Sequence, residues 1–160
     1  AYTKDAAATS AWRNACYHSV RNGDCAGFVN ALSSLFASIG YDLTDRLSEQ
    51  AYQCVVVAIL RYIGVDLSAE VTTSRGRIDM VCFAPGNVVI VEMKVASGQE
   101  AGERAADEAV RQIRERGYAE RFACDQRRVQ LLGISFDCER HNIAAWRCEE
   151  LDAAGAQGRV

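Results

Sequence analysis

The run from Val88 to Val95 constrains the fold of this 160-residue chain more than any other segment. Its sequence, Val-Val-Ile-Val-Glu-Met-Lys-Val, consists mostly of strong strand formers and therefore predicts a β-strand. Side chains alternate between the two faces of a strand, so Glu92 and Lys94 lie on the same face. Burying an acid and a base costs free energy unless other groups replace the lost water. The sequence therefore points to a functional reason for this charged pair.

The composition limits the function classes that this pair can serve. Lys94 is one of two lysines beside sixteen arginines, and 49% hydrophobic content suits one domain with its own core. A net charge of −3 and a pI of about 5.4 argue against non-specific wrapping of DNA, but they leave room for a local phosphate site. No apolar run approaches the roughly 18 residues of a membrane span, and the N-terminus has no signal-peptide pattern. We therefore expect a cytoplasmic protein without membrane contact.

The cysteines and histidines do not form a zinc pattern. The seven cysteines are odd in number and widely spaced, none lies in a C-x-x-C motif, and His18 is far from His141. This distribution argues against a structural zinc site and predicts free thiols in a reducing compartment.

Hydrophobic spacing predicts two or three helices, a three-stranded meander, one helix and two final strands. The expected helices span residues 10–20, 24–39, 44–62 and 100–119, and the expected strands span 65–72, 77–83, 88–95, 128–136 and 142–151. Asp24 is the expected N-cap of the second helix and Gly40 its stop signal. The third helix is expected to bury one face, made by Leu47, Ala51, Val55, Ala58 and Leu60. Residues 1–22 are interpreted as an extension or linker remnant with a loose start, 23–152 as a single domain and 153–160 as a tail.

The hairpin around Pro85 can be paired on paper. If residues 84–87 form the turn, antiparallel partners have residue numbers that sum to 171, so Asp79 faces Glu92. Two directly opposed carboxylates destabilise a sheet unless a cation lies between them. Mg²⁺ prefers oxygen ligands and needs one or two protein carboxylates. A lysine one step along can activate the attacking water or stabilise charge on a phosphoryl group. This register predicts a metal-assisted phosphodiester hydrolase, and the alternative is a surface charge ladder in which the acids pair with Arg77 and Lys94.

At Asp79 and Glu92-Met93-Lys94 the chain resembles the PD-(D/E)-x-K nuclease superfamily. The surrounding segments Gly76–Asp79, Val91–Lys94 and Gln112-Ile113, followed by Gly117-Tyr118-Ala119, resemble one bacterial branch in which this domain commonly follows an AAA-ATPase-like module. Further similarity lies in the segments 36–41 and 133–136, so that the resemblance covers roughly residues 20–150. The chain differs from that branch in having Met93 in place of an aromatic residue and no proline near Ile39-Gly40-Tyr41. No P-loop pattern is present, so the ATPase-like module is not on this chain.

The resemblance implies an α/β fold with a restriction-endonuclease-like core. Its central mixed sheet of four to five strands is flanked by helices in αβββαβ order, here with extra N-terminal helices. It also implies Mg²⁺- or Mn²⁺-dependent hydrolysis of nucleic acid, with DNA favoured over RNA. Asp79, Glu92 and the backbone carbonyl of Met93 become the metal ligands, and Lys94 becomes the catalytic lysine. Glu49 in the first core helix is the candidate for an additional catalytic acid.

Several other residues are candidates for substrate contact. Gln112 and Tyr118 match positions at which related nucleases order the site or position substrate. Arg77, Arg111 and Arg114 could hold phosphates, although acids interleave with the last two and a solvated helix face stays open as the alternative. The expected partners are nucleic acid and an AAA-ATPase-like module in cis or in trans. A homodimer and a catalytically silent binding module with the nuclease fold are alternatives that the sequence leaves open.

Overall fold

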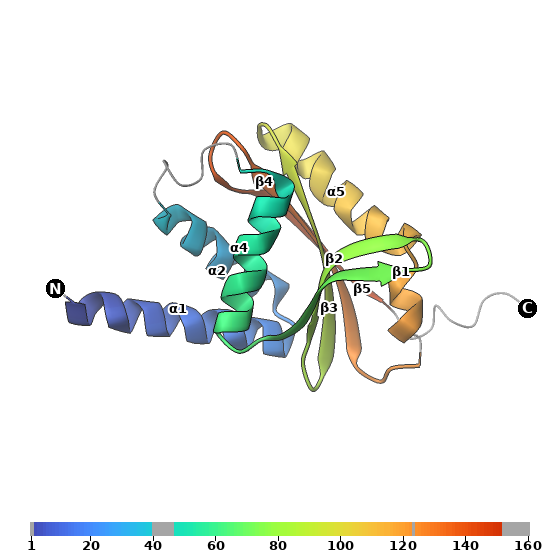
Figure 1. The fold of residues 1–160 in the computed structure, drawn as a ribbon, viewed down its shortest axis with the longest axis horizontal. Coiled ribbons are helices and arrows are strands. Elements are labelled where there is room, and N and C mark those ends of the chain that lie inside the picture. The colour runs from blue at the N-terminus through green and yellow to red at the C-terminus, as the bar shows by residue number, and fades with distance from the viewer. Residues whose placement is uncertain (1, 40–46, 123, 152–160) are drawn as a thin grey trace, which may run out of the picture.

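The computed structural model of the chain describes residues 2–39, 47–122 and 124–151, with their side chains from residue 7 onward (Figure 1). The helices are α1 Tyr2–Asn22, α2 Cys25–Ser38, α4 Glu49–Tyr62 and α5 Gln99–Glu115, with a short 3₁₀ helix at Tyr118–Phe122. The strands are β1 Asp66–Thr73, β2 Gly76–Phe83, β3 Asn87–Ala96, β4 Arg128–Asp137 and β5 Asn142–Leu151. None of the helices in these ranges combines the length and apolar character that a bilayer crossing requires.

The five strands form one mixed sheet in the order β1-β2-β3-β4-β5. All neighbouring pairs are antiparallel except β3 and β4, which are parallel and are joined by the crossover through α5. Helices α1, α2 and α4 cover one face of this sheet and α5 covers the other (Figure 1). The expected α/β fold with a restriction-endonuclease-like core is therefore confirmed, and the sheet has five strands.

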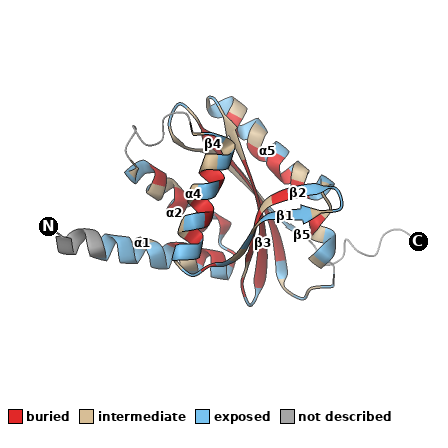
Figure 2. Cartoon of the chain, in the orientation of Figure 1, coloured by how far each residue is buried: buried red, intermediate tan, exposed pale blue. Residues whose placement is uncertain are grey.

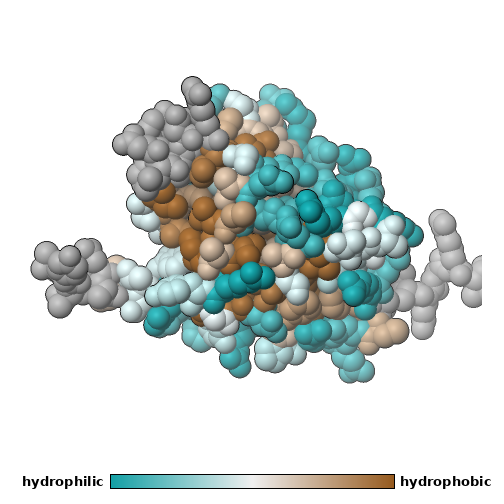
Figure 3. Space-filling view, viewed as in Figure 1, coloured by the Kyte–Doolittle hydropathy of each residue, from teal (hydrophilic) through white to brown (hydrophobic). Residues whose placement is uncertain are grey.

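Side chains of alternating strand residues build a core on each face of the sheet. Val89, Val91 and Met93 of β3 pack toward α1, α2 and α4, whereas Val88 and Ile90 pack toward α5. Strands β3 and β4, the second half of β2 and the inner sides of the helices are accordingly buried, while β1 and the outward side of α1 are largely exposed (Figure 2). On the face drawn in Figure 3, apolar side chains gather over α4, and polar side chains cover the β1–β2 hairpin and α5. Glu92 is two residues after Ile90 on the strand, so the two side chains point to the same face of the sheet, which is the α5 face.

The structure differs from three expectations about the helices. Residues 2–10 are helical rather than loose, and Ala6-Ala7-Ala8 supply high helix propensity there. Helix α4 begins at Glu49, where the Ser48 hydroxyl accepts the Ala51 N–H, so residues 47–48 precede the helix instead of belonging to it. The expected start at residue 44 or 45 lies outside the described residues. Its buried face consists of Tyr52, Gln53, Val56, Val57 and Leu60, so Leu60 alone of the expected set is buried.

Other local expectations are confirmed. The Asp24 carboxylate caps α2 by accepting the Gly27 N–H at 2.9 Å. Gly64, with φ +90°, follows the end of α4. Gly40 and the tail 153–160 lie outside the described residues. The boundary between an extension and the domain at residue 22 stays a prediction, although Cys16 and Val20 of α1 belong to the core.

Gly133 of β4 allows α5 to lie close against the sheet. A Cβ atom at this position would be 2.5 Å from the Ala106 carbonyl oxygen and 2.9 Å from the Ala109 Cβ. Gly133 is also the β4 partner of Glu92 in the parallel ladder, so this close approach occurs directly beside Glu92. The missing side chain therefore helps to bring α5 within reach of the acid.

We expect Gly133→Ala to destabilise the protein by about 1–3 kcal/mol, because backbone and buried side chains must shift to admit the methyl group. Urea unfolding of both proteins measures this difference. Gly86→Ala is the matched control, since a Cβ at Gly86 meets no atom within 4 Å. Equal losses in the two variants would contradict the packing argument.

Candidate active site

Strands β2 and β3 separate at Asp79. In all four observed pairs, from Phe83↔Val88 to Met80↔Val91, the two residue numbers sum to 171, as expected. The β2–β3 ladder ends after the last of these pairs. The β1–β2 ladder also skips Asp79, whose position lies opposite Glu70, a residue with a positive φ of 51°. Beyond this point β2 continues with β1 as a hairpin that runs toward the C-terminal end of α5 (Figure 1). Asp79 therefore stands where β2 leaves the ladder with β3 and where its ladder with β1 is interrupted for one pair.

Side chains replace the missing ladder bonds at this point. The Asp79 N–H donates to Glu92 Oε2 at 3.3 Å, and the Met93 N–H donates to Asp79 Oδ2 at 2.8 Å. Each acid thus binds the backbone of the opposite strand. The two carboxylates converge as the hairpin register predicted, although they do so at a split in the sheet rather than as a regular cross-strand pair.

Glu92 is 1% exposed and is surrounded by donors from α5 and β3. Its Oε1 accepts a hydrogen bond from Gln112 Nε2 and lies 3.1 Å from Arg116 Nη1 and 3.5 Å from Lys94 Nζ. Gln112 and Arg116 are four residues apart on α5 and therefore share one helix face. The absence of a side chain at Gly76 leaves room for the Arg116 side chain, because a Cβ at Gly76 would lie 3.2 Å from the guanidinium Nε. The buried charge of Glu92 is thus compensated by two cations and two N–H donors.

Lys94 connects this group to helix α4. Its Nζ lies 3.8 Å from Glu49 Oε1, and its side chain is 20% exposed. Glu49 is the first residue of α4, so the described structure brings the candidate helix acid to the candidate lysine. Asp79, Glu92, Lys94, Glu49 and Gln112 consequently form one cluster at the end of the β2–β3 ladder.

Within the cluster, the surroundings of Asp79 disfavour the charged form of its carboxyl group. Burial raises the pKa of Asp79 to about 6, and the neighbouring charges of Glu92 and Glu49 act in the same direction. The hydrogen bond from Met93 and the charge of Lys94 lower the pKa but do not offset these effects. A carboxylate that is charged at neutral pH under these conditions is a suitable ligand for a cation.

Gln53 also supports Asp79, and sequence reasoning missed it. Its side chain is 8% exposed on α4, and its Nε2 donates to the Asp79 carbonyl oxygen at 3.1 Å. Both main-chain groups of Asp79 are therefore held by side chains, the N–H by Glu92 and the carbonyl by Gln53. The available signal was a polar residue inside the otherwise apolar segment Tyr52–Leu60.

We expect Gln53→Met to destabilise the protein by about 1–3 kcal/mol, because the Asp79 carbonyl loses its partner while the side-chain volume is nearly kept. Chemical denaturation measures the loss. Gln50→Met on the exposed side of the same helix serves as the control and should stay within about 0.5 kcal/mol of the original chain. Identical midpoints for all three proteins would remove Gln53 from the account of the site.

The structure does not bring the other substrate candidates into this cluster. Arg77 pairs with Glu70 at 3.7 Å on the exposed hairpin, Arg111 pairs with Glu115 at 3.2 Å, and Arg114 pairs with Glu149 on β5. Tyr118 is 4% exposed and packs against Phe122 in the core on the α5 face. Arg116, the C-cap residue of α5, is the arginine that reaches Glu92.

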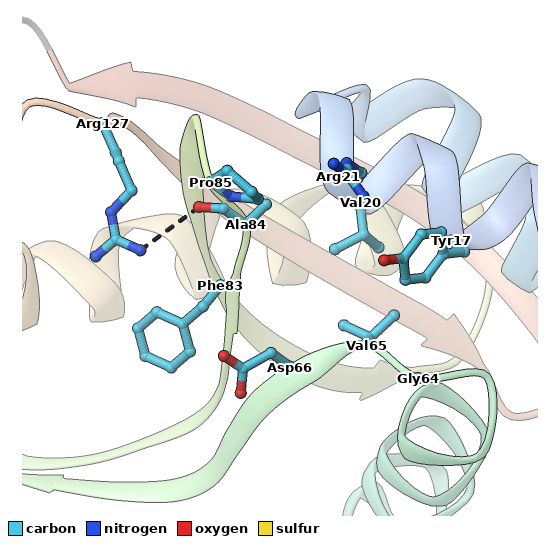
Figure 4. A pocket seen from close by; sticks show the side chains of 10 residues that line it. All are labelled: Tyr17, Val20, Arg21, Gly64, Val65, Asp66, Phe83, Ala84, Pro85 and Arg127. Carbon is cyan, nitrogen blue, oxygen red and sulfur yellow. Dashed lines mark hydrogen bonds between the residues drawn. The ribbon is translucent and has the colours of Figure 1, made fainter.

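A cavity of the described structure lies away from this cluster. It has a volume of about 370 Å³ and is lined by Tyr17 and Val65 together with Ala84-Pro85 at the β2–β3 turn. Figure 4 shows Arg127 at its rim, with a hydrogen bond to the Ala84 carbonyl oxygen. This turn is at the opposite end of β3 from Glu92 and Lys94, so the cavity is separate from the cluster of charged residues.

The donor set at the cluster fits a hard divalent cation. No group of three or more His, Cys, Asp and Glu side chains within the described ranges is placed to hold a metal ion. Mg²⁺ binds through only one or two protein carboxylates and otherwise keeps its waters, and Asp79 and Glu92 supply two. Glu92 Oε2 accepts one hydrogen bond and a carboxylate oxygen offers about two lone pairs, so it retains coordinating capacity.

Comparison with known proteins gives two matches. A family model described as the PD-(D/E)XK nuclease superfamily matches residues 47–146, which is 100 of the 160 residues and includes all the clustered residues. The chain is also 29% identical over 132 residues to a protein from Azotobacter chroococcum mcd 1, described as "Uncharacterized protein in vnfD 5'region". That similarity takes in 80% of this chain and 25% of the relative, so the chain spans about a quarter of the relative's length.

Proposed function

Because this chain belongs to the PD-(D/E)XK nuclease superfamily, we propose that it is a metal-dependent hydrolase of nucleic-acid phosphodiester bonds. The observation that supports this most directly is the convergence of Asp79, Glu92 and Lys94 where β2 separates from β3. Two carboxylates and one ammonium are a suitable set for binding a divalent cation next to a phosphate.

In this proposal Asp79, Glu92 and the Met93 carbonyl hold Mg²⁺ or Mn²⁺. The bound ion supplies charge stabilisation at the phosphoryl oxygens and a more acidic water. Lys94 positions and activates the attacking water and stabilises negative charge that develops on the phosphoryl group. Its ammonium lies near Glu92 and Glu49, and this places it at the edge of the proposed metal site.

Gln112 and Arg116 act mainly through Glu92 in this scheme. Their contacts with Oε1 fix the orientation of the carboxylate and leave Oε2 toward Asp79. Glu49 limits the freedom of the Lys94 ammonium and can assist the ion through water. We keep Arg77, Arg111, Arg114 and Tyr118 out of the reaction scheme, because their contacts lie outside the cluster.

The test is hydrolysis of labelled single- and double-stranded DNA and of RNA, with EDTA, Mg²⁺ or Mn²⁺ present. We expect cleavage only with a divalent ion, DNA as the better substrate, and a higher melting temperature in the presence of the same ion. If none of these substrates is cleaved and neither ion changes the melting temperature, the proposal fails. Nucleic-acid binding without any requirement for metal would favour the silent binding module instead.

The biological setting is part of the proposal only in outline. We propose a cytoplasmic role on DNA, where the substrate and Mg²⁺ are both available. An AAA-ATPase-like partner and a homodimer stay predictions from the sequence resemblance.

A further inference from the structure

Cys25 and Cys148 form a close pair of thiols outside the nuclease site. Their sulfur atoms are 2.7 Å apart and hydrogen-bonded, although the residues are 123 positions apart in the sequence. Cys25 is the first residue of α2 and is 7% exposed, while Cys148 is partly exposed on the edge strand β5. A movement of less than about 1 Å would bring the sulfurs to the disulfide bond length of about 2.05 Å.

The surroundings make the two thiols chemically unequal. The hydrogen bond between them lowers the pKa of Cys148, and the Arg128 guanidinium acts in the same direction against the effect of partial burial. The same hydrogen bond, together with burial, raises the pKa of Cys25. Cys148 is the thiol that solvent reaches, and it lies beside the Arg128 guanidinium, which are two properties of a peroxide-reactive thiol.

We propose that Cys25 and Cys148 are a redox-active pair that hydrogen peroxide converts to a reversible disulfide. The Cys148 thiolate attacks one peroxide oxygen, the O–O bond breaks, and the departing hydroxide takes up a proton to become water. The Cys25 sulfur then attacks the Cys148 sulfenic acid, and the S–O bond breaks. The released hydroxide combines with the Cys25 proton. Two thiols and one peroxide thus give one disulfide and two waters, and a dithiol reductant reverses the change.

The bridge would join the start of α2 to the edge of the sheet. Strand β5 pairs only with β4 within the described sheet, so a covalent link restrains its free side. Both cysteines lie on the α1–α2–α4 face, whereas Glu92 faces α5, from which Gln112 and Arg116 contact it. We therefore expect oxidation to change resistance to unfolding and to leave the arrangement around Glu92 intact.

The test is oxidation of the folded protein with hydrogen peroxide, followed by thiol counting and peptide mapping. Trypsin releases residues 22–46 and 148–159 as peptides that carry one cysteine each, Cys25 and Cys148. We expect two of the seven thiols to disappear and these two peptides to be recovered as one cross-linked species that dithiothreitol separates. The melting temperature of the oxidised protein should rise by about 5–15 °C.

Three variants make the result decisive. Cys25→Ser and Cys148→Ser should each abolish the cross-linked species and the rise in melting temperature, whereas Cys54→Ser, at an exposed position on α4, should keep both. The proposal is overturned if the cross-link joins other cysteines. It is also overturned if the cross-link forms only in urea, because the folded geometry is the reason to expect it.

Discussion

Lys94→Met should lower the rate of nucleic-acid cleavage by about a thousandfold and leave the fold intact. Removing a group that acts on the reacting atoms typically costs two to four orders of magnitude in rate. Methionine keeps most of the length and volume of the lysine stem and removes only the ammonium, which lies 3.5 Å from Glu92 Oε1. Glu92 retains its contacts with Arg116 and Gln112, so the carboxylate does not lose all compensation in the variant. Single-turnover cleavage at saturating Mg²⁺ measures the effect directly.

The control for this prediction is Arg111→Met. Arg111 is a cation on α5 whose partners, Glu108 and Glu115, lie on the same exposed helix face. Its removal also takes away one positive charge, so it separates a general loss of charge from the loss of a catalytic group. We expect its cleavage rate to stay within about threefold of the original chain, since a screened surface pair contributes little. A Lys94→Met protein that keeps more than a tenth of the activity would exclude Lys94 as the catalytic lysine.

Asp79→Asn should stabilise the metal-free protein at pH 8 while it abolishes the response to divalent ions. The pKa of Asp79 is raised from 3.8 to about 6 in the folded state, so ionisation of this carboxyl opposes folding. The cost is absent below about pH 4, grows as the pH rises through the interval between the two pKa values, and is complete above pH 6. A shift of roughly two pKa units corresponds to about 3 kcal/mol at most. Asparagine removes the charge and can still accept the Met93 N–H.

The matched control is Asp137→Asn, which should change the stability at pH 8 in the opposite direction. Burial alone would raise the pKa of Asp137, but hydrogen bonds from the Glu139 and Arg140 N–H groups outweigh it and lower the pKa. Asp137→Asn should therefore destabilise the protein at pH 8, and the loss should persist at pH 4.5 and shrink only as the pH falls below 3.8, the pKa of the free carboxyl. Urea unfolding at pH 4.5 and pH 8 in EDTA, repeated with Mg²⁺ at pH 8, measures both variants. If Asp79→Asn is no more stable than the original chain at pH 8, ionisation of the Asp79 carboxyl does not oppose folding.

The register of the central hairpin could be predicted from the sequence because its turn is short and well marked. Pro85-Gly86 fixes where β2 ends and β3 begins, and four observed pairs follow from that position alone. The split at Asp79 could not be predicted in this way. It arises because side chains of Asp79, Glu92 and Gln53 take over main-chain bonds, and spacing carries no information about such substitutions.

The buried face of α4 illustrates a different limit. The segment from Tyr52 to Leu60 is apolar on most sides, so hydrophobic periodicity does not define one face. Packing against β-strand residues such as Met80 and the position of the Ser48 cap decide its rotation in the folded chain. Gln53 was missed for the same reason, since its inward position became visible only with that rotation.

The Asp79 and Glu92 carboxylates each accept a main-chain hydrogen bond from the other strand, and these two bonds connect the β1–β2 hairpin to the site. Each carboxylate accepts a main-chain N–H of the other strand, so a cation that binds Asp79 Oδ2 shares this oxygen with the Met93 N–H and weakens that hydrogen bond. Occupancy of the carboxylates and separation of the two strands are therefore linked quantities, and each must shift the equilibrium of the other. The hairpin also contacts the 3₁₀ helix after α5 through Arg75 and Glu120, so a shift of β2 relative to β3 is transmitted to that helix as well.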